Sequence, residues 1–429
     1  MHQGFKKDLQ FYKFSLYGFL KNLRFFEPFL YLFFLEKGLN FLQIGTLITI
    51  REITRNVLEI PTGVLADSLG RRRIMIMAFL FYIISFIVFY ISVSYGLFIV
   101  AMFCYSFGDA FRTGTHKAMI FTYLKNKNWE DQKVWYYGYT RSASQFGSAI
   151  SSLLAAFIVF YSGSYRYVFL FSVIPYVLDL LLMFSYPREL DGRIRKLNLS
   201  HIRENFRSII KETKQSFREL RVFRVLTNTA LFSGYFSAMK DYLQPIILGL
   251  VITLPVLFSW NREQTTAVMI GLVYFILYIL SAITSRNSGR IAGKFNGLYR
   301  LLNLSLIAGL FIGMAGGYFY SLGTTFWIVL SIVFFVAVHL TENFRRPVGV
   351  SYIADQFKED ILATVLSAES QVKSLYAALI APVIGFMADR FGLEWGLAIT
   401  SCLLLFATPF IMIGKDKAKA KAEEGLKNY

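Results

Sequence analysis

Residues 74–93 read IMIMAFLFYIISFIVFYISV, a stretch without a single charged side chain. A helix that crosses the hydrocarbon core of a membrane needs roughly 20 apolar residues, each rising 1.5 Å, so this stretch has the length of one crossing. It is apolar on every face, whereas a strand of an outer-membrane barrel alternates apolar and polar residues. The stretch therefore predicts a membrane-spanning α-helix.

Comparable apolar stretches recur from Phe11 to Ile413, separated by short polar segments. The 429 residues are 55% hydrophobic and 17% charged, and the mean hydropathy is +0.49, outside the usual range of soluble globular proteins. We predict an all-α polytopic membrane protein with about twelve transmembrane helices in two six-helix bundles. The predicted spans are 11–35, 41–66, 74–94, 96–124, 135–160, 166–186, 222–252, 266–286, 299–319, 323–353, 363–388 and 395–413.

The formal net charge of +18 raises the possibility of nucleic-acid binding, but the positions of the basic residues favour another cause. If the N-terminus is cytoplasmic, the loops on the opposite side hold few cations beyond Lys37, Arg166, Arg262 and Arg390. The cytoplasmic segments then hold Lys6, Lys7, Lys13, Arg71, Arg72, Arg73, Lys125, Lys127 and Lys133, the basic 188–224 region and the Lys415 to Lys427 tail. We expect a multi-pass protein of the bacterial inner membrane with both termini cytoplasmic, with the lipid bilayer and not nucleic acid as its partner.

The one long hydrophilic interruption divides the spans into six and six. We expect an N-terminal bundle over 1–186, a cytoplasmic amphipathic linker over 187–221, a C-terminal bundle over 222–414 and a basic cytoplasmic tail over 415–429. In the linker, Ser200 can cap a helix that mixes apolar and basic residues and lies on the membrane surface; a solvated tether is the alternative. Short echoes between the halves, such as 141–145 and 366–371, suggest an internal repeat.

Between the second and third spans, residues 61–73 read PTGVLADSLGRRR. This segment resembles G-x-L-A-D-x-x-G-R-[RK], the cytoplasmic signature of the major facilitator superfamily, and the surrounding motifs look like a poorly characterised bacterial branch. The resemblance extends over the whole chain in layout but over only about a dozen residues in motif. It implies that this loop is a conformational latch between the bundles, with Gly63, Asp67, Gly70, Arg71 and Arg72 as its residues.

Two related segments differ from this pattern. Residues 288–294 occupy the equivalent place in the second half but lack the aspartate, so a latch there would be degenerate. Residues 385–392, GFMADRFG, look similar but fall on the opposite side of the membrane in the expected topology, where we assign no latch role. The glycine-rich antiporter signature of the superfamily is absent from Tyr139 to Phe160.

An ionisable group at the centre of a membrane helix costs several kcal/mol unless it is paired or hydrated, so the intramembrane charges are the best candidates for transport chemistry. In the first half their spacing places them on common helix faces around one polar cavity. A carboxylate beside an arginine can carry a proton, and Glu27, Glu59 and Asp109, with His116, are the proton-coupling candidates. Guanidinium groups can hold an anion, and the substrate-binding candidates are Arg24, Arg55, Arg112, Arg141, Gln145, Lys240, Asp241, His339 and Glu342. Salt bridges that only hold the bundle together are the alternative.

Lys240 and Asp241 are adjacent, so on a helix they point about 100° apart and need not pair. The four histidines and two cysteines lack the paired spacing of a metal site, so we expect no bound metal. The sequence contains no nucleotide-binding loop motif, so we expect neither ATP-driven pumping nor an enzyme. We expect no cofactor and a monomer. The leading functional hypothesis is proton-coupled export of a small anionic or amphiphilic solute. Proton-coupled uptake of a nutrient anion or zwitterion is the alternative, and a non-transporting membrane sensor or scaffold is the alternative from another class.

Overall fold

The computed structural model describes residues 6–129, 132–191, 220–254, 260–295, 297–357 and 359–414, together with most of their side chains. Within these ranges every regular element is helical. The first half contains α1 (Leu9–Lys21), η1 (Glu27–Phe29), α2 (Leu30–Glu36), α3 (Phe41–Leu69), α4 (Arg71–Ile91), α5 (Tyr95–Arg112), α6 (Thr115–Asn126), α7 (Lys133–Ser162), α8 (Tyr167–Phe184) and η3 (Arg188–Asp191). The second half contains α10 (Leu220–Met239), η4 (Lys240–Tyr242), α11 (Leu243–Thr253), α12 (Arg262–Ala292), α13 (Leu298–Ser321), α14 (Thr325–Gln356), α15 (Glu359–Phe391) and α16 (Leu393–Ile411).

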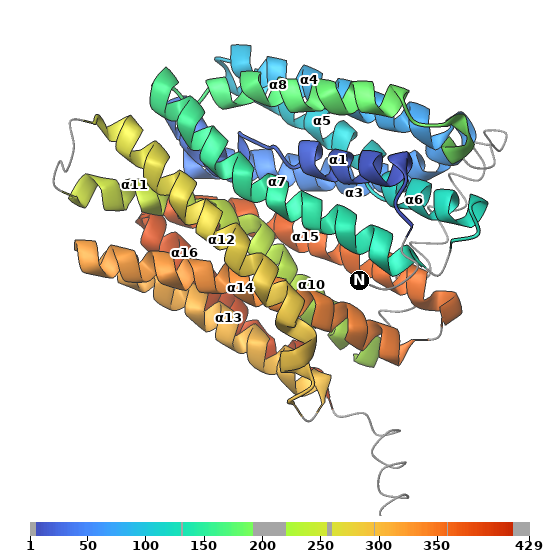
Figure 1. The fold of residues 1–429 in the computed structure, drawn as a ribbon. Helices are drawn as coiled ribbons and strands as arrows, with labels where there is room; N and C mark the ends of the chain where they lie inside the picture. Colours follow the sequence, from blue (N-terminus) through green and yellow to red (C-terminus); the bar gives the residue numbers. More distant parts are fainter. Residues whose placement is uncertain are drawn as a thin grey trace, which may run out of the picture.

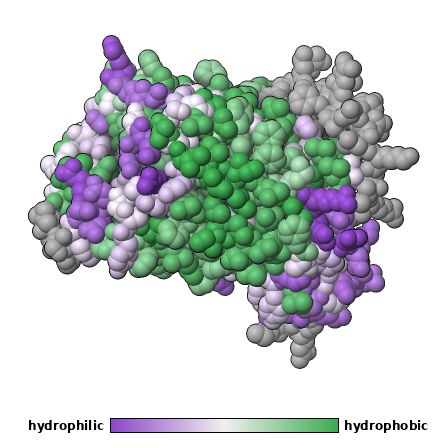
Figure 2. All heavy atoms as spheres, turned by 90° about the horizontal axis from the view of Figure 1, so that it is seen from above, coloured by the Kyte–Doolittle hydropathy of each residue, from purple (hydrophilic) through white to green (hydrophobic). Residues whose placement is uncertain are grey.

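These elements form twelve spans, as predicted. Eight are single helices long and apolar enough to cross a membrane by length and composition. The other four are interrupted or carry charged residues: α1–η1–α2, α3, α5–α6 and α10–η4–α11. A broad belt of hydrophobic side chains separates two hydrophilic ends in Figure 2. The chain is therefore a multi-pass membrane protein.

Three spans are broken near the middle of the molecule. Span one leaves its helix after Lys21 and resumes at Glu27, next to Pro28, which has no backbone N–H to donate. Span four breaks at Gly114, whose φ of 78° favours glycine. Span seven tightens into a 3₁₀ turn at Lys240–Tyr242, shortly before Pro245. Such breaks bring backbone groups and charged side chains together inside a membrane protein.

The spans pack into two six-helix bundles, which confirms the predicted fold class. In Figure 1 the helices of the first half (blue to green) form one group and those of the second half (yellow to red) another, with α15 facing the first group. The two bundles meet chiefly where α3 packs on α15 and α7 packs on α12. Residues 192–219 and 415–429 lie outside the described residues, so the amphipathic linker and the basic tail stay predictions.

We call the end of the molecule where α1 begins and α16 ends the terminal face, and the opposite end the distal face. At the distal face the bundles are in close contact. A Cβ atom on Gly385 of α15 would clash with the carbonyl oxygen of Phe41, and one on Gly45 of α3 would lie 2.5 Å from that of Ala381. These glycines let the two helix backbones touch.

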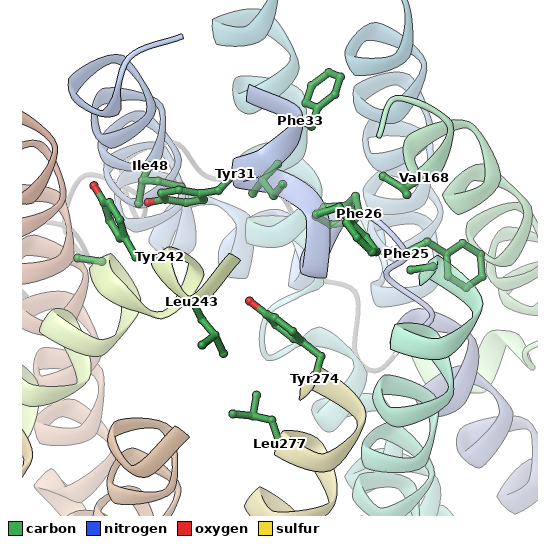
Figure 3. Close-up of a cluster of buried hydrophobic side chains, with 14 of the residues drawn as sticks. Phe25, Phe26, Tyr31, Phe33, Ile48, Val168, Tyr242, Leu243, Tyr274 and Leu277 are labelled. Carbon is green, nitrogen blue, oxygen red and sulfur yellow. The ribbon is translucent and has the colours of Figure 1, made fainter. Parts of the chain in front are cut away.

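Aromatic side chains complete the distal contact. The rings of Tyr31 and Tyr242, from opposite bundles, lie 4.9 Å apart, and Figure 3 shows the two side chains next to each other. The backbone N–H of Tyr31 donates to Gln244 Oε1 over 2.8 Å. Phe160 of α7 packs edge-on against Trp260 beside α12. The distal face is therefore closed between the bundles.

Candidate functional site

A cavity of about 460 Å³ lies between the bundles at mid-depth. Its wall carries seven cationic side chains, Arg24, Arg51, Arg55, Arg112, Lys240, Arg346 and Lys373. It also carries five carboxylates, Glu27, Glu52, Asp109, Asp241 and Glu342. The intramembrane charges of both halves therefore meet around one site, which we call the central cavity.

A second cavity of about 680 Å³ lies nearer the terminal face and shares Arg346 and Lys373 with the central cavity. We call it the vestibule. Its described lining contains one carboxylate, Glu369, and five cations, Lys117, Arg141, Arg345, Arg346 and Lys373. Lys117, Arg141 and Arg346 are exposed. The two cavities thus form a path from the terminal face to the middle of the molecule, lined by more cations than carboxylates.

The break in span one carries the ion pair that joins the bundles inside the central cavity. Glu27 lies 3.5 Å from Arg24 of its own span and accepts a hydrogen bond of 2.9 Å from Lys240 Nζ of span seven. The side-chain amide of Gln244 donates to the Glu27 carbonyl oxygen over 2.9 Å. Lys240 also lies 3.4 Å from Asp241 Oδ1, because the tight turn there brings these adjacent side chains within ion-pair distance.

The i, i+3 spacing of α3 brings Glu52 and Arg55 together, with 2.6 Å between Oε2 and Nη2. Arg51 lies 3.2 Å from the other oxygen of Glu52, whose side chain is buried. Arg55 also donates over 2.9 Å to Ser374 Oγ of α15 in the other bundle. Arg55 is therefore a contact between the bundles as well as part of the cavity wall.

The same spacing on α5 places Arg112 2.7 Å from Asp109. Asp109 accepts a further hydrogen bond of 2.7 Å from the Tyr82 hydroxyl of α4 and lies 3.5 Å from Arg55. Arg112 Nε donates to the same hydroxyl over 3.1 Å. Asp109 consequently links α3, α4 and α5 around the first-half wall.

On the second-half wall, His339 and Glu342 of α14 are both buried and line the central cavity. His339 Nδ1 lies 2.9 Å from the Phe335 carbonyl oxygen, within its own helix. Glu342 accepts a hydrogen bond of 2.8 Å from Ser233 through one oxygen, and the other oxygen has no partner among the described residues. Gln145 lines the central cavity, whereas Arg141 lines the vestibule.

Two predicted proton-coupling residues line neither cavity. Glu59, on α3 toward the terminal face, is outside both described linings. His116, after the break in span four, is buried with its ring stacked 3.6 Å from that of Tyr17 and its Nε2 3.2 Å from the Tyr186 hydroxyl. An unbroken helix would place Asp109, Arg112 and His116 on one face, but α5 ends at Arg112 and the break at Gly114 turns His116 into the bundle.

The predicted latch residues lie at the terminal face within the first bundle. Gly70 turns the chain between α3 and α4 with φ 95°, and a Cβ atom there would lie 2.9 Å from Asp191. The Arg72 N–H donates to Asp191 and its guanidinium to the Tyr186 carbonyl, while Arg71 donates to Thr122. A Cβ atom added at Gly63 would meet no atom of the described residues within 4 Å, so no described neighbour packs closely against this glycine. The Asp67 side chain lies outside the described residues.

Sequence reasoning did not single out Lys373, at the junction of the two cavities, or the tyrosines of the cavity wall, Tyr105, Tyr274 and Tyr278. It also assigned no role to Asp389, which accepts hydrogen bonds of 2.8 Å from the N–H groups of Phe41 and Leu42. Asp389 thereby caps α3 from the other bundle and holds the distal face closed. The signal was the similarity of 385–392 to the latch motif.

No group of three or more His, Cys, Asp or Glu side chains that could hold a metal ion occurs in the part of the chain that the structure describes. Cys104 and Cys402 are free thiols. The described site is thus a charged, hydrogen-bonded cavity between the two bundles.

Comparison with known proteins agrees with this architecture. The chain is 23% identical over 408 residues to the uncharacterized MFS-type transporter YxaM of Bacillus subtilis (strain 168), covering 92% of each chain. The crystal structure of the nucleoside transporter NupG superposes with a TM-score of 0.77 at 13% identity, over 95% of this chain and 100% of that one. A crystal structure of a D-xylose-proton symporter gives 0.68 at 15% identity, over 95% and 97%.

These two structures share the fold of the chain. The sequence profile of the Major Facilitator Superfamily matches residues 18–368. This match covers most of the chain and agrees with the two six-helix bundles and with the cavity between them. The chain therefore belongs to the Major Facilitator Superfamily, a family of membrane transporters and not of enzymes.

Proposed function

We propose that the protein is a proton-coupled secondary active transporter that exports a small organic anion, or an amphiphile with an anionic group, by alternating access. The observation that carries the proposal is the excess of cations along the path from the terminal face through the vestibule to the central cavity. A cavity lined by one sign of charge concentrates solutes of the opposite sign. Guanidinium groups also bind carboxylate or phosphate through paired hydrogen bonds.

The location follows from charge as well. Lys6, Lys7, Arg71, Arg72 and Lys125 lie at the terminal face, and the distal loops hold few cations. The positive-inside rule then favours a cytoplasmic terminal face, with both termini inside the bacterial inner membrane. On this assignment the described state is closed to the outside and accessible from the cytoplasm.

Proton coupling is supported by the ion pair between Glu27 and Lys240. The pair joins the two bundles on the distal side of the central cavity, so protonation of Glu27 removes one attraction that keeps that side closed. Asp109, between Arg55 and Arg112, is the second candidate. We assign Glu59 and His116 no direct contact with the transported solute, since neither lines the cavities.

Proteoliposomes test this proposal. Anions that raise the melting temperature of the purified protein are identified first, and each is then applied as an outward or inward gradient while internal pH is followed with a dye. Antiport predicts proton movement opposite to the anion, and uptake by symport predicts movement in the same direction. Absence of anion-dependent proton flux for every stabilising anion would contradict proton coupling.

The sensor or scaffold hypothesis makes a different prediction. If the protein is a sensor or scaffold, the wild type moves no solute and the cavity charges serve only packing. Asp109→Asn and Arg112→Ala then lower thermal stability and change no transport rate. If the protein is a transporter, Asp109→Asn lowers transport of the identified anion at least ten-fold while the protein remains folded. Glu59→Gln, outside the cavities, serves as the matched carboxylate control and retains most of the wild-type rate.

A further inference from the structure

A buried carboxyl group inside the first bundle stands apart from the central cavity. Asp179 lies on α8 and is 0% exposed. Neither of its oxygens has a hydrogen-bond partner among the described residues. Burial of an ionised carboxylate without a partner costs more free energy than almost any other arrangement of a side chain, so such a group either carries a proton or acquires a cation.

The helices around α8 supply few candidates for that cation. The charged groups that act on Asp179 are Lys21 of α1 and Arg112 of α5. The titratable groups around Asp179 are three tyrosines: Tyr17 of α1, Tyr176 of α8 and Tyr186, which follows α8 in the chain. From helix α4, the rings of Phe79 and Tyr82 contact Tyr176. Arg141 of α7 lines the vestibule.

Arg112 is already paired with Asp109 and hydrogen-bonded to Tyr82. Lys21 is buried, at 8% exposed, and forms no ion pair within 4.0 Å in the part of the chain that the structure describes. A buried amino group and a buried carboxyl group thus lie near each other without being joined. The cost of burial that favours the neutral carboxylic acid also favours the neutral amine. Of Lys21 and Arg112, Arg112 alone has a carboxylate within 4.0 Å among the described residues.

The position of Lys21 connects this pair to the transport path. Lys21 is the last residue of α1, immediately before the break in span one, and its carbonyl oxygen accepts a hydrogen bond of 3.2 Å from the Tyr176 hydroxyl. Glu27 follows the break and pairs with Lys240 of the other bundle. Lys21 and Glu27 thus flank the same break in span one, Lys21 against α8 and Glu27 against the other bundle.

We propose that Asp179 and Lys21 form a proton-binding site within the first bundle, distinct from the central cavity. In the described state Asp179 carries the proton as a carboxylic acid. When the break in span one shifts, the O–H bond of Asp179 breaks, the proton forms a new N–H bond on the Lys21 amine, and the resulting carboxylate and ammonium pair. The use of this site in coupling rests on the proposed function, but its protonation does not.

Infrared difference spectroscopy of the purified protein tests the site without any solute. Titration of the wild-type protein across neutral and alkaline pH is expected to reveal the C=O stretching band of a protonated carboxylic acid, and Asp179→Asn is expected to lose it. Asp109→Asn serves as the control, because Asp109 is ion-paired and its replacement leaves the band in place. A band that persists in Asp179→Asn, or no such band in the wild type, overturns the proposal.

The role of Lys21 is tested by Lys21→Met, which keeps the length of the side chain and removes its amino group. Without an amine to take the proton, the Asp179 band is expected to persist to higher pH than in the wild type. An unchanged titration would overturn the role of Lys21. This variant also keeps the proposal testable if Asp179→Asn does not fold. A band that titrates as expected in a protein without proton flux would leave the site standing and refute the transport proposal instead.

Discussion

At the distal face the two bundles meet through backbone, ring and capping contacts, whereas at the terminal face they border a vestibule lined with cations. Gly45 and Gly385 bring the helix backbones together, and Tyr31 packs on Tyr242. In the vestibule, Lys117 and Arg141 of the first bundle face Arg346 and Lys373 of the second. One end is held by close packing, and the other carries like charges on both sides.

This difference suggests how the two ends can exchange states. The distal contacts are separate and modest, since a neutral hydrogen bond or a helix cap contributes about 1 kcal/mol. Closing the terminal face brings like charges together, which costs free energy that an anion between them would offset. The distal contacts and the vestibule charges thus act on the same conformational equilibrium. A change at either end is expected to shift the populations of the open and closed states at both ends.

The largest effect is expected from Gly385→Val. A side chain at this position meets the Phe41 backbone, which cannot move aside as a flexible side chain would, and overpacking of this kind typically costs about 1–3 kcal/mol. We expect the population closed at the distal face to fall at least ten-fold. Pulsed electron paramagnetic resonance between spin labels at Val93 and Leu322, which are exposed on opposite bundles, measures it.

Gly138→Ala is the matched control for that substitution, because a Cβ atom there meets nothing within 4 Å. It is expected to leave the label distance as in the wild type. A Gly385→Val protein with the wild-type distance distribution would contradict the close packing at the distal face.

The next largest effect is expected from the ion pair in the central cavity. Glu27→Gln leaves Lys240 with Asp241 alone, and Lys240→Met leaves Glu27 with Arg24 alone. Since both side chains are partly exposed, each change is expected to cost about 1–3 kcal/mol of stability. The double variant should be less destabilised than the sum of the two, and thermal unfolding of all three reveals this coupling. Strict additivity would mean that the pair does not join the bundles.

A smaller effect is expected from the cap that Asp389 places on α3. Asp389→Ala removes two hydrogen bonds to backbone N–H groups and a negative charge at a helix N-terminus, which together contribute about 1–2 kcal/mol. The distal face should open about five-fold more often, measured with the same spin labels. Asp389→Asn keeps one acceptor, so its shift should be smaller, and equal shifts would indicate that the carboxylate does not act as a cap.

The smallest effect is expected from salt. Raising the ionic strength from 0.1 to 1 M shortens the screening length from about 10 Å to about 3 Å. Repulsion across the vestibule then weakens, and the terminal face should close slightly more often. Spin labels at Asn126 and Gly289, exposed near that face, report the change, and no response or a widening would argue against electrostatic separation.

The sequence predicted the twelve spans, the two bundles and several of the charged residues of the central cavity because these depend on local properties. Apolar length marks a span, and the spacing of Glu52 with Arg55 and of Asp109 with Arg112 places each pair on one helix face. The helix breaks limited this reasoning. His116 was assigned to the same stripe as Asp109, but the break at Gly114 separates them.

Contacts between distant parts of the chain were beyond sequence reasoning. The partnership of Glu27 with Lys240 and the cap from Asp389 to α3 depend on how the two bundles pack. Asp179 was overlooked because a single carboxyl in an apolar span carries no local pattern. Its exceptional position became apparent only from its burial and from the missing partners of its oxygens.

The most direct test of alternating access follows both ends of one protein. Cys104 and Cys402 are first replaced by alanine, and labels are placed at Val93 and Leu322 or at Asn126 and Gly289. Alternating access predicts that a stabilising anion, identified by thermal shift and examined across a pH series, lengthens the distal distance and shortens the terminal one in the same fraction of molecules. Distances that stay fixed at both ends, or that lengthen at both ends together, would contradict it.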